Sequence, residues 1–80
     1  MYVGGEVKTP GHIFTLGEVT VLRAIQIAGD LTDRANRKKI EYFSANGQKV
    51  IINWYKAVED PRLDLRFQSG DYVWVPARRF

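Results

Sequence analysis

Strand-forming sequence at both ends of the chain is the feature that most restricts its fold. Near the C-terminus, Gly70-Asp71 predicts a tight turn, because glycine adopts positive φ freely and aspartate hydrogen-bonds its own backbone. The run Tyr72–Val75 then has high strand propensity, and Pro76 ends it because proline has no N–H to donate. At the other end, Tyr2–Val7 is a second run of this kind. A small domain framed by terminal strands is therefore expected.

The first half of the chain also predicts a hairpin followed by a helix. A second strand is expected over His12–Leu16, after a turn in which Pro10 and Gly11 suit the two central positions of a type II conformation. The helix is expected over Thr20–Ala28, where the first residue can cap the N-terminus through its hydroxyl. Gly29 suits the left-handed residue that ends such a helix.

The second half predicts another hairpin and a short helical turn. Strands are expected over Lys39–Ser44 and Lys49–Asn53, joined by Asn46-Gly47, which favours a type I′ turn. Residues 54–58 are expected to form a helical turn. Hairpin strands around one helix indicate an α+β domain rather than a doubly wound sheet. If the last strand lies parallel to the first, the five predicted strands follow the order 2-1-5-3-4.

The composition is that of one small globular domain. The chain has 80 residues, no cysteine and a formal charge of +3, which excludes disulfides, thiol nucleophiles and cysteine-based zinc sites. A mildly basic balance of this size is mostly that of a solvated mixed surface. Met1 directly precedes a predicted strand, with no signal peptide or membrane span. We therefore expect residues 1–80 to be a single domain excised from a longer chain.

The alternation of side chains in the last strand predicts an aromatic surface. Val73 and Val75 should share the face that packs on the helix, which leaves Tyr72 and Trp74 on the uncovered face. Trp74 can shield the backbone near Gly4 on the neighbouring strand. The same two aromatics can also contact a neighbouring domain, a subunit or a sugar, and the two roles are compatible.

A dense basic cluster lies between the helix and the third strand. It consists of Arg34, Arg37, Lys38 and Lys39. Plain solvation is the favoured interpretation, and contact with phosphate, an anionic sugar or an acidic neighbour is the alternative. Nucleic-acid binding is not expected, because it favours exposed aromatics among the basic residues, and alternation should turn at least one of the adjoining aromatics at positions 42 and 43 inward.

Catalysis is poorly supported by the sequence. His12 is the only histidine, and Ser44 and Ser69 lie in turn-like contexts without a nucleophile elbow. Glu59-Asp60 and Asp64 are typical of a solvated turn rather than of an acid–base pair. One histidine without cysteine does not supply the usual zinc ligands. We expect no enzyme activity, no catalytic residues, no cofactor and no metal site.

Three blocks of the sequence resemble the SLBB domain, a soluble ligand-binding β-grasp module. They are residues 5–11 (GEVKTPG), residues 20–32 with TVLRAI and AGDLT, and residues 65–76 with LRFQ and GDYVWVP. The blocks occur in the family's order and spacing and cover nearly the whole chain. The resemblance assigns a structural role to six residues: Pro10, Gly11, Gly29, Gly70, Asp71 and Pro76.

The resemblance is greatest to the SLBB modules of bacterial outer-membrane polysaccharide export proteins. It implies a β-grasp (ubiquitin-like) fold with a five-stranded mixed sheet and one main helix. It further implies a non-catalytic, periplasmic module of a capsular or exopolysaccharide exporter. In that family the subunits assemble into homo-oligomeric rings around a channel. The expected partners are sibling domains and copies of the parent protein, which is associated with the outer membrane, and membrane contact is expected only through parts outside this chain.

Two alternatives and one departure from the family stay open at this point. The module could bind oligosaccharide, with sugar stacking on Trp74 or Trp54 and with basic side chains such as Arg34, Arg37 and Lys38 steering an anionic chain. It could also be an accessory module of a competence or redox-complex protein, since SLBB domains occur in both. The family commonly has Gly-Gly where this chain has Gly29-Asp30, so a ligand-contacting glycine turn is less expected there.

Overall fold

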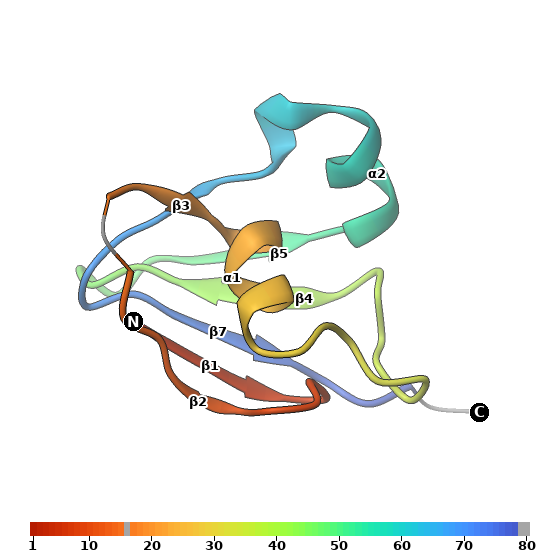
Figure 1. Cartoon of the computed structure of the whole chain (residues 1–80). Helices are drawn as coiled ribbons and strands as arrows, with labels where there is room; N and C mark the ends of the chain where they lie inside the picture. Colours follow the sequence, from red (N-terminus) through yellow and green to blue (C-terminus); the bar gives the residue numbers. More distant parts are fainter. Residues whose placement is uncertain (16, 79–80) are drawn as a thin grey trace.

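The first and last strands lie side by side and parallel at the centre of one sheet (Figure 1). Strand β1 (Tyr2–Gly5) pairs with β7 (Tyr72–Val75) in register from Tyr2 opposite Tyr72. The other strands are β2 (Gly11–His12), β4 (Ile40–Phe43) and β5 (Lys49–Ile52), and the order is β2-β1-β7-β4-β5. Both the predicted strand order and the predicted parallel pairing are confirmed.

The computed structural model describes residues 1–15 and 17–78, which form a small α+β domain with a five-stranded mixed sheet and one main helix. The sequence did not predict its second sheet, in which β3 (Val19–Thr20) pairs with β6 (Arg66–Phe67). The expected helical turn is the short helix α2 (Trp54–Glu59), which is followed by the 3-10 helix η1 (Pro61–Leu63).

The main helix α1 (Val21–Ile27) begins with two side-chain caps. The Thr20 hydroxyl accepts a hydrogen bond from the Arg23 N–H at 3.3 Å, as predicted from the sequence. The Asp64 carboxylate accepts a second one from the Leu22 N–H at 2.9 Å. Two of the N–H groups that a helix leaves without partners in its first turn are thereby satisfied.

Gly29 ends α1 in the left-handed conformation that was predicted for it, with φ 87°. Its N–H donates to the Gln26 carbonyl at 3.0 Å, and the Asp30 N–H donates to the Ile25 carbonyl at 2.9 Å. These two bonds make a Schellman motif. Asp30 itself has φ 78° and is the only non-glycine with positive φ among the described residues.

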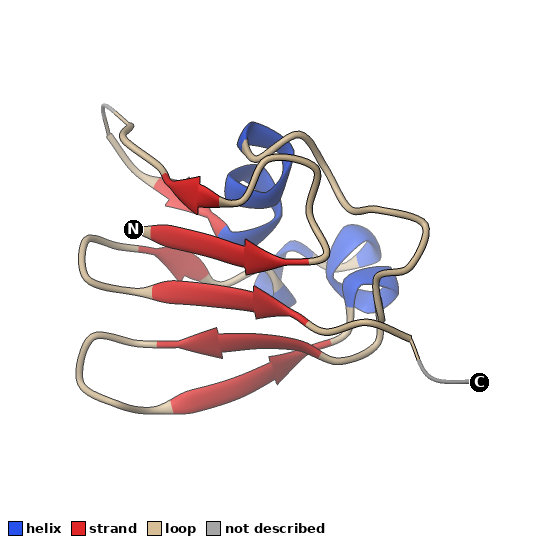
Figure 2. Ribbon diagram, turned by 90° about the horizontal axis from the view of Figure 1, so that it is seen from below, coloured by secondary structure: helices blue, strands red, loops and turns tan. Residues whose placement is uncertain are grey.

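The hydrophobic core lies between the sheet and the two helices, which occupy one side of it (Figures 1 and 2). Ile25 of α1 is fully buried, as are Val73 and Val75 of β7, and Ala57 is the buried residue of α2. Burying each Val or Ile side chain contributes about 1.5–3 kcal/mol. Neither of these helices covers the opposite side of the sheet.

The first strand ends earlier than expected, at Gly5 instead of Val7. Gly5 has φ 84°, and a Cβ atom there would lie 2.1 Å from the Val75 carbonyl oxygen. Val7 leaves the sheet and forms an isolated bridge with Leu31. The strand stops because the chain turns toward the end of α1 through a position that only glycine fits.

The expected second strand over residues 12–16 is also shorter. Strand β2 spans Gly11–His12, so only His12 of the expected range is paired, and Leu16 lies outside the described residues. Gly11 has the predicted positive φ, but its value of 152° differs from the value near +80° of a type II turn. The Lys8 N–H donates to Asp30 at 3.1 Å and the Thr9 N–H to Ala28 at 2.8 Å. Contacts with the end of α1 therefore shape this loop.

The β4–β5 hairpin forms as predicted, but its turn is not type I′. That turn needs positive φ at both central residues, and only Gly47, not Asn46, has it, with φ 92°. The Gly47 N–H donates to the Ser44 carbonyl at 2.9 Å, and the Gln48 carbonyl accepts from the Ser44 N–H at 2.9 Å. This is a three-residue loop with a left-handed glycine at its end.

Candidate functional site

One face of the five-stranded sheet is covered by neither helix (Figure 2), and the strand pairing places a band of aromatic side chains on that face. The pairing register places His12, Tyr2, Tyr72 and Phe43 in one row over β2, β1, β7 and β4. Trp74 lies in the next row, beside Gly4 and Glu41. We call His12, Tyr2, Phe43, Tyr72 and Trp74 the aromatic face.

Contacts between neighbouring rings give this band a fixed geometry. Tyr2 and His12 meet edge to face at 5.3 Å between ring centroids, and Phe43 and Tyr72 stack at 4.5 Å and 7°. The Lys49 ammonium lies 5.7 Å from the Phe43 ring centroid. Because β4 lies between β7 and β5, Lys49 and Tyr72 flank Phe43 on opposite sides. Phe43 therefore has a neighbour on each side and offers no open ring face for stacking on a sugar.

Trp74 covers the backbone of β1 at Gly4. A Cβ atom at Gly4 would lie 2.7 Å from the Tyr2 ring and 3.1 Å from the Trp74 ring. Tyr72 and Trp74 are still 40% and 43% exposed, whereas Val73 is fully buried. Both sequence predictions for this strand are confirmed: the aromatics point away from the helix, and Trp74 shields the glycine strand.

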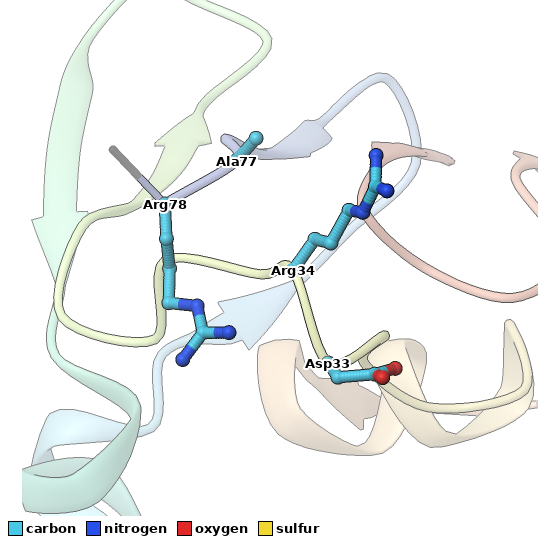
Figure 3. Close-up of a pocket in the computed structure, with 4 residues that line it drawn as sticks. All are labelled: Asp33, Arg34, Ala77 and Arg78. Atoms are coloured by element: carbon cyan, nitrogen blue, oxygen red, sulfur yellow. The ribbon is translucent and has the colours of Figure 1, made fainter. Parts of the chain in front are cut away.

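Two hollows adjoin at Ala77, just beyond the end of β7. The first has a volume of about 420 Å³, and its charged side chains are Asp33, Arg34 and Arg78, which point in different directions around it (Figure 3). The second has a volume of about 580 Å³. Its lining consists of Asn36, Lys38, Lys39, Glu41, Lys49, Ile51, Pro76 and Ala77. We call the two hollows together the basic groove.

Backbone pairing holds the groove's two walls together. Ala35 and Ala77 form an antiparallel bridge. The Asn36 N–H donates to the Pro76 carbonyl at 2.8 Å, and the Arg78 N–H donates to the Arg34 carbonyl at 2.7 Å. The predicted basic cluster is thereby joined to the C-terminal segment and to Lys49 of β5. The sequence did not predict this, because these segments are far apart in the chain.

Arg37 and Trp54 pair with each other instead of joining the groove. The Arg37 guanidinium carbon lies 4.9 Å from the Trp54 ring centroid. The Trp54 N–H also donates to the Arg37 carbonyl at 2.7 Å, and the ring packs partly buried against the core. Both residues were candidates for ligand contact, but in the structure they hold the start of α2 against the preceding loop.

Asp71 has a larger structural role than the turn residue that the sequence predicted. It is 5% exposed, and its carboxylate accepts hydrogen bonds from Ala45 N–H at 2.9 Å, Gln68 N–H at 2.8 Å and the Tyr42 hydroxyl at 2.8 Å. Burial, together with this bond and the charge of Asp71, raises the pKa of Tyr42 to about 12. Asp71 therefore joins the β4–β5 hairpin to the turn at Gly70, which has φ 88°.

His12 lies apart from the two serines that were considered with it for catalysis. His12 lies on the edge strand β2, and Ser44 lies in the β4–β5 hairpin at the other side of the sheet, where its hydroxyl bonds Asn46. Ser69 lies in the turn before β7. The structure does not bring them into one pocket.

Two of the three carboxylates near η1 cap helix ends. Asp60 caps η1 and pairs with Arg62 at 2.9 Å, and the hydrogen bonds from Arg62 hold the Asp60 pKa below its usual value. Asp64 caps α1. Glu59 is the exposed last residue of α2.

Within residues 1–15 and 17–78, no three histidine, cysteine or acidic side chains are placed to hold a metal ion. No helix in this part of the chain combines the length and apolar character needed to cross a membrane. No protein-family model and no curated protein matches the chain. The aromatic face and the basic groove are therefore the two candidate functional surfaces of the domain.

Proposed function

We propose that this domain is a non-catalytic β-grasp module of the SLBB type that packs its aromatic face against a second copy in a periplasmic polysaccharide-export assembly. The aromatic face is the observation that carries the proposal. Tyr72 and Trp74 are large side chains, 40% and 43% exposed, on a sheet face that neither α1 nor α2 covers. Aromatic residues are enriched where proteins associate, and grouped exposed apolar side chains mark such surfaces.

Two features of the fold support the β-grasp and SLBB part of the proposal. The terminal strands β1 and β7 are parallel central neighbours in the order β2-β1-β7-β4-β5. Asp30 has φ 78°, a conformation that glycine adopts at least cost, at the position where the SLBB family commonly has glycine. The resemblance supplies the periplasmic location, the outer-membrane association of the parent protein and the export role.

Two aromatic rings of the domain, Phe43 and Trp54, are less suited to sugar stacking than to packing against protein. A sugar stacks on an open ring face, but Phe43 has Tyr72 on one side and Lys49 on the other. The ring of Trp54, the second tryptophan considered for a sugar, has Arg37 over it. A second sheet needs no open ring face, because it contacts the side chains from above.

Thiol cross-linking tests this proposal, because the chain has no cysteine of its own. Ile51 lies in the row of Glu41 and Trp74 on the uncovered face and is 51% exposed, and Val58 on α2 is 54% exposed. A bis-maleimide should join copies carrying Ile51→Cys in the assembled exporter, and should join copies carrying Val58→Cys far less. Equal cross-linking at the two positions would contradict the proposed face.

A further inference from the structure

We infer that the basic groove binds a segment of an acidic polysaccharide, a chain that carries both carboxylates and hydroxyls. The groove lies at the end of β7, around the α1–β4 connection and along Glu41, Lys49 and Ile51 of β4 and β5, and its lining contains none of the five residues of the aromatic face. The inference thus goes beyond the proposed packing role, and each can fail without the other.

The positive charge of the chain is concentrated in the groove. Five of the twelve basic residues and two of the nine acidic residues line it. The groove therefore carries a formal charge of +3, which equals the charge of the whole chain. The basic and acidic residues outside the groove are equal in number and carry no net formal charge. A hollow lined by one sign of charge focuses the field and attracts ligands of the opposite sign.

Three cations of the groove are available to a ligand. Lys49 pairs with Glu41 at 3.1 Å, but Arg34, Lys38 and Lys39 make no ion pair within the described part of the chain. All three residues are exposed. Arg34, Lys38 and Lys39 carry like charges that repel one another, so an anionic ligand relieves that repulsion as well as making new contacts.

The backbone presents these cations in a fixed arrangement. The Asn36 amide oxygen accepts from the Lys38 N–H at 3.2 Å, and the Asn36 carbonyl accepts from the Lys39 N–H at 3.2 Å. Ala35 is 2% exposed and bridges Ala77. A preformed backbone lowers the entropy lost on binding.

The lining favours an acidic sugar over a nucleic acid. Glu41 and Asp33 supply carboxylates and Asn36 supplies an amide, which accept hydrogen bonds from sugar hydroxyls. A phosphodiester backbone has acceptors only, so it offers no hydrogen-bond donor to these two carboxylates. No aromatic side chain is among the described residues that line the groove, although single-stranded nucleic acids bind largely through base stacking.

Isothermal titration of the 80-residue chain with hexagalacturonate tests the inference. Binding should be measurable at low salt and should weaken as salt is added, because screening acts on exposed charges. Neutral maltohexaose should not bind. In the triple variant Arg34→Gln, Lys38→Gln and Lys39→Gln, the affinity should fall about tenfold, because each exposed ion pair contributes little by itself and three are removed together.

A charge-matched triple variant separates a site from a general attraction. Lys8→Gln, Arg23→Gln and Lys56→Gln remove the same charge from exposed positions outside the groove, and should reduce the affinity far less. Circular dichroism verifies that both variants fold. Equal losses in the two variants, absence of hexagalacturonate binding to the parent chain, or tighter binding of hexathymidylate would each overturn the inference. None of these outcomes bears on packing through the aromatic face.

Discussion

The hydrogen bond from Tyr42 to Asp71 gives the fold a dependence on alkaline pH. The folded pKa of Tyr42 is about 12, above the value near 10 of an unperturbed tyrosine. Because the folded value is raised, the bond's stabilisation is complete below pH 10 and is lost as the pH rises through 12. Tyr42→Phe should cost about 2 kcal/mol at neutral pH, as for a hydrogen bond to a charged group.

Urea unfolding at neutral pH and near pH 12 measures how much this hydrogen bond stabilises the fold at each pH. The difference in unfolding free energy between the native chain and Tyr42→Phe should shrink at the higher pH. Tyr72→Phe is the control, because it removes a hydroxyl from an exposed tyrosine. A difference that does not change with pH would show that the bond to Asp71 is not the source of the stabilisation.

Gly5 is the residue whose replacement the backbone tolerates least. A Cβ atom there would lie 2.1 Å from the Val75 carbonyl oxygen, and φ is 84°. Gly5→Ala should therefore destabilise the domain by more than about 2 kcal/mol, because strain and a backbone clash combine. Gly47 has φ 92° with nothing within 4 Å, so Gly47→Ala should cost only about 1 kcal/mol. Equal denaturant midpoints for the two variants would contradict the close packing of β1 on β7.

At the scale of elements, α1 depends on a cap supplied from far away in the sequence. Asp64 accepts from the Leu22 N–H at 2.9 Å across 42 positions, whereas Thr20 is the local cap. Asp64→Ala and Thr20→Ala should each lower the unfolding free energy by about 1 kcal/mol. Thermal unfolding, monitored by circular dichroism, measures the loss of stability in both variants, and Asp33→Ala is the control at an exposed position. An Asp64→Ala variant as stable as the control would argue against this cap.

The sequence predicted those elements whose limits are set locally. The Thr20 cap and Gly29 define α1, and Pro76 follows the end of β7. The pairing of β3 with β6 was not predictable, because each strand has two residues and their pairing is a tertiary contact. The turn at Asn46-Gly47 suits more than one loop type, and a contact from Asp71 to Ala45 accompanies the longer loop.

At the scale of the whole molecule, the two candidate surfaces differ in how far the sequence predicts them. Strand alternation is enough to place Tyr72 and Trp74 on the uncovered face. The groove gathers Arg34 with Arg78 and Lys49, residues that only the folded sheet brings near one another. The sequence predicted that Arg37 would act with the other residues of the basic cluster. In the structure its guanidinium packs over the Trp54 ring instead, because a cation over an aromatic ring is itself stabilising.

Sedimentation velocity of the chain over a micromolar to millimolar concentration series tests the central claim most directly. Association through the aromatic face should appear as a concentration-dependent rise in sedimentation coefficient for the native chain. Trp74→Ser should abolish the rise, and Tyr55→Ser should preserve it, because Tyr55 is 51% exposed on α2 and lies off the uncovered face. A native chain that stays monomeric throughout, or a rise that Trp74→Ser leaves intact, would contradict the proposed packing of copies through this face.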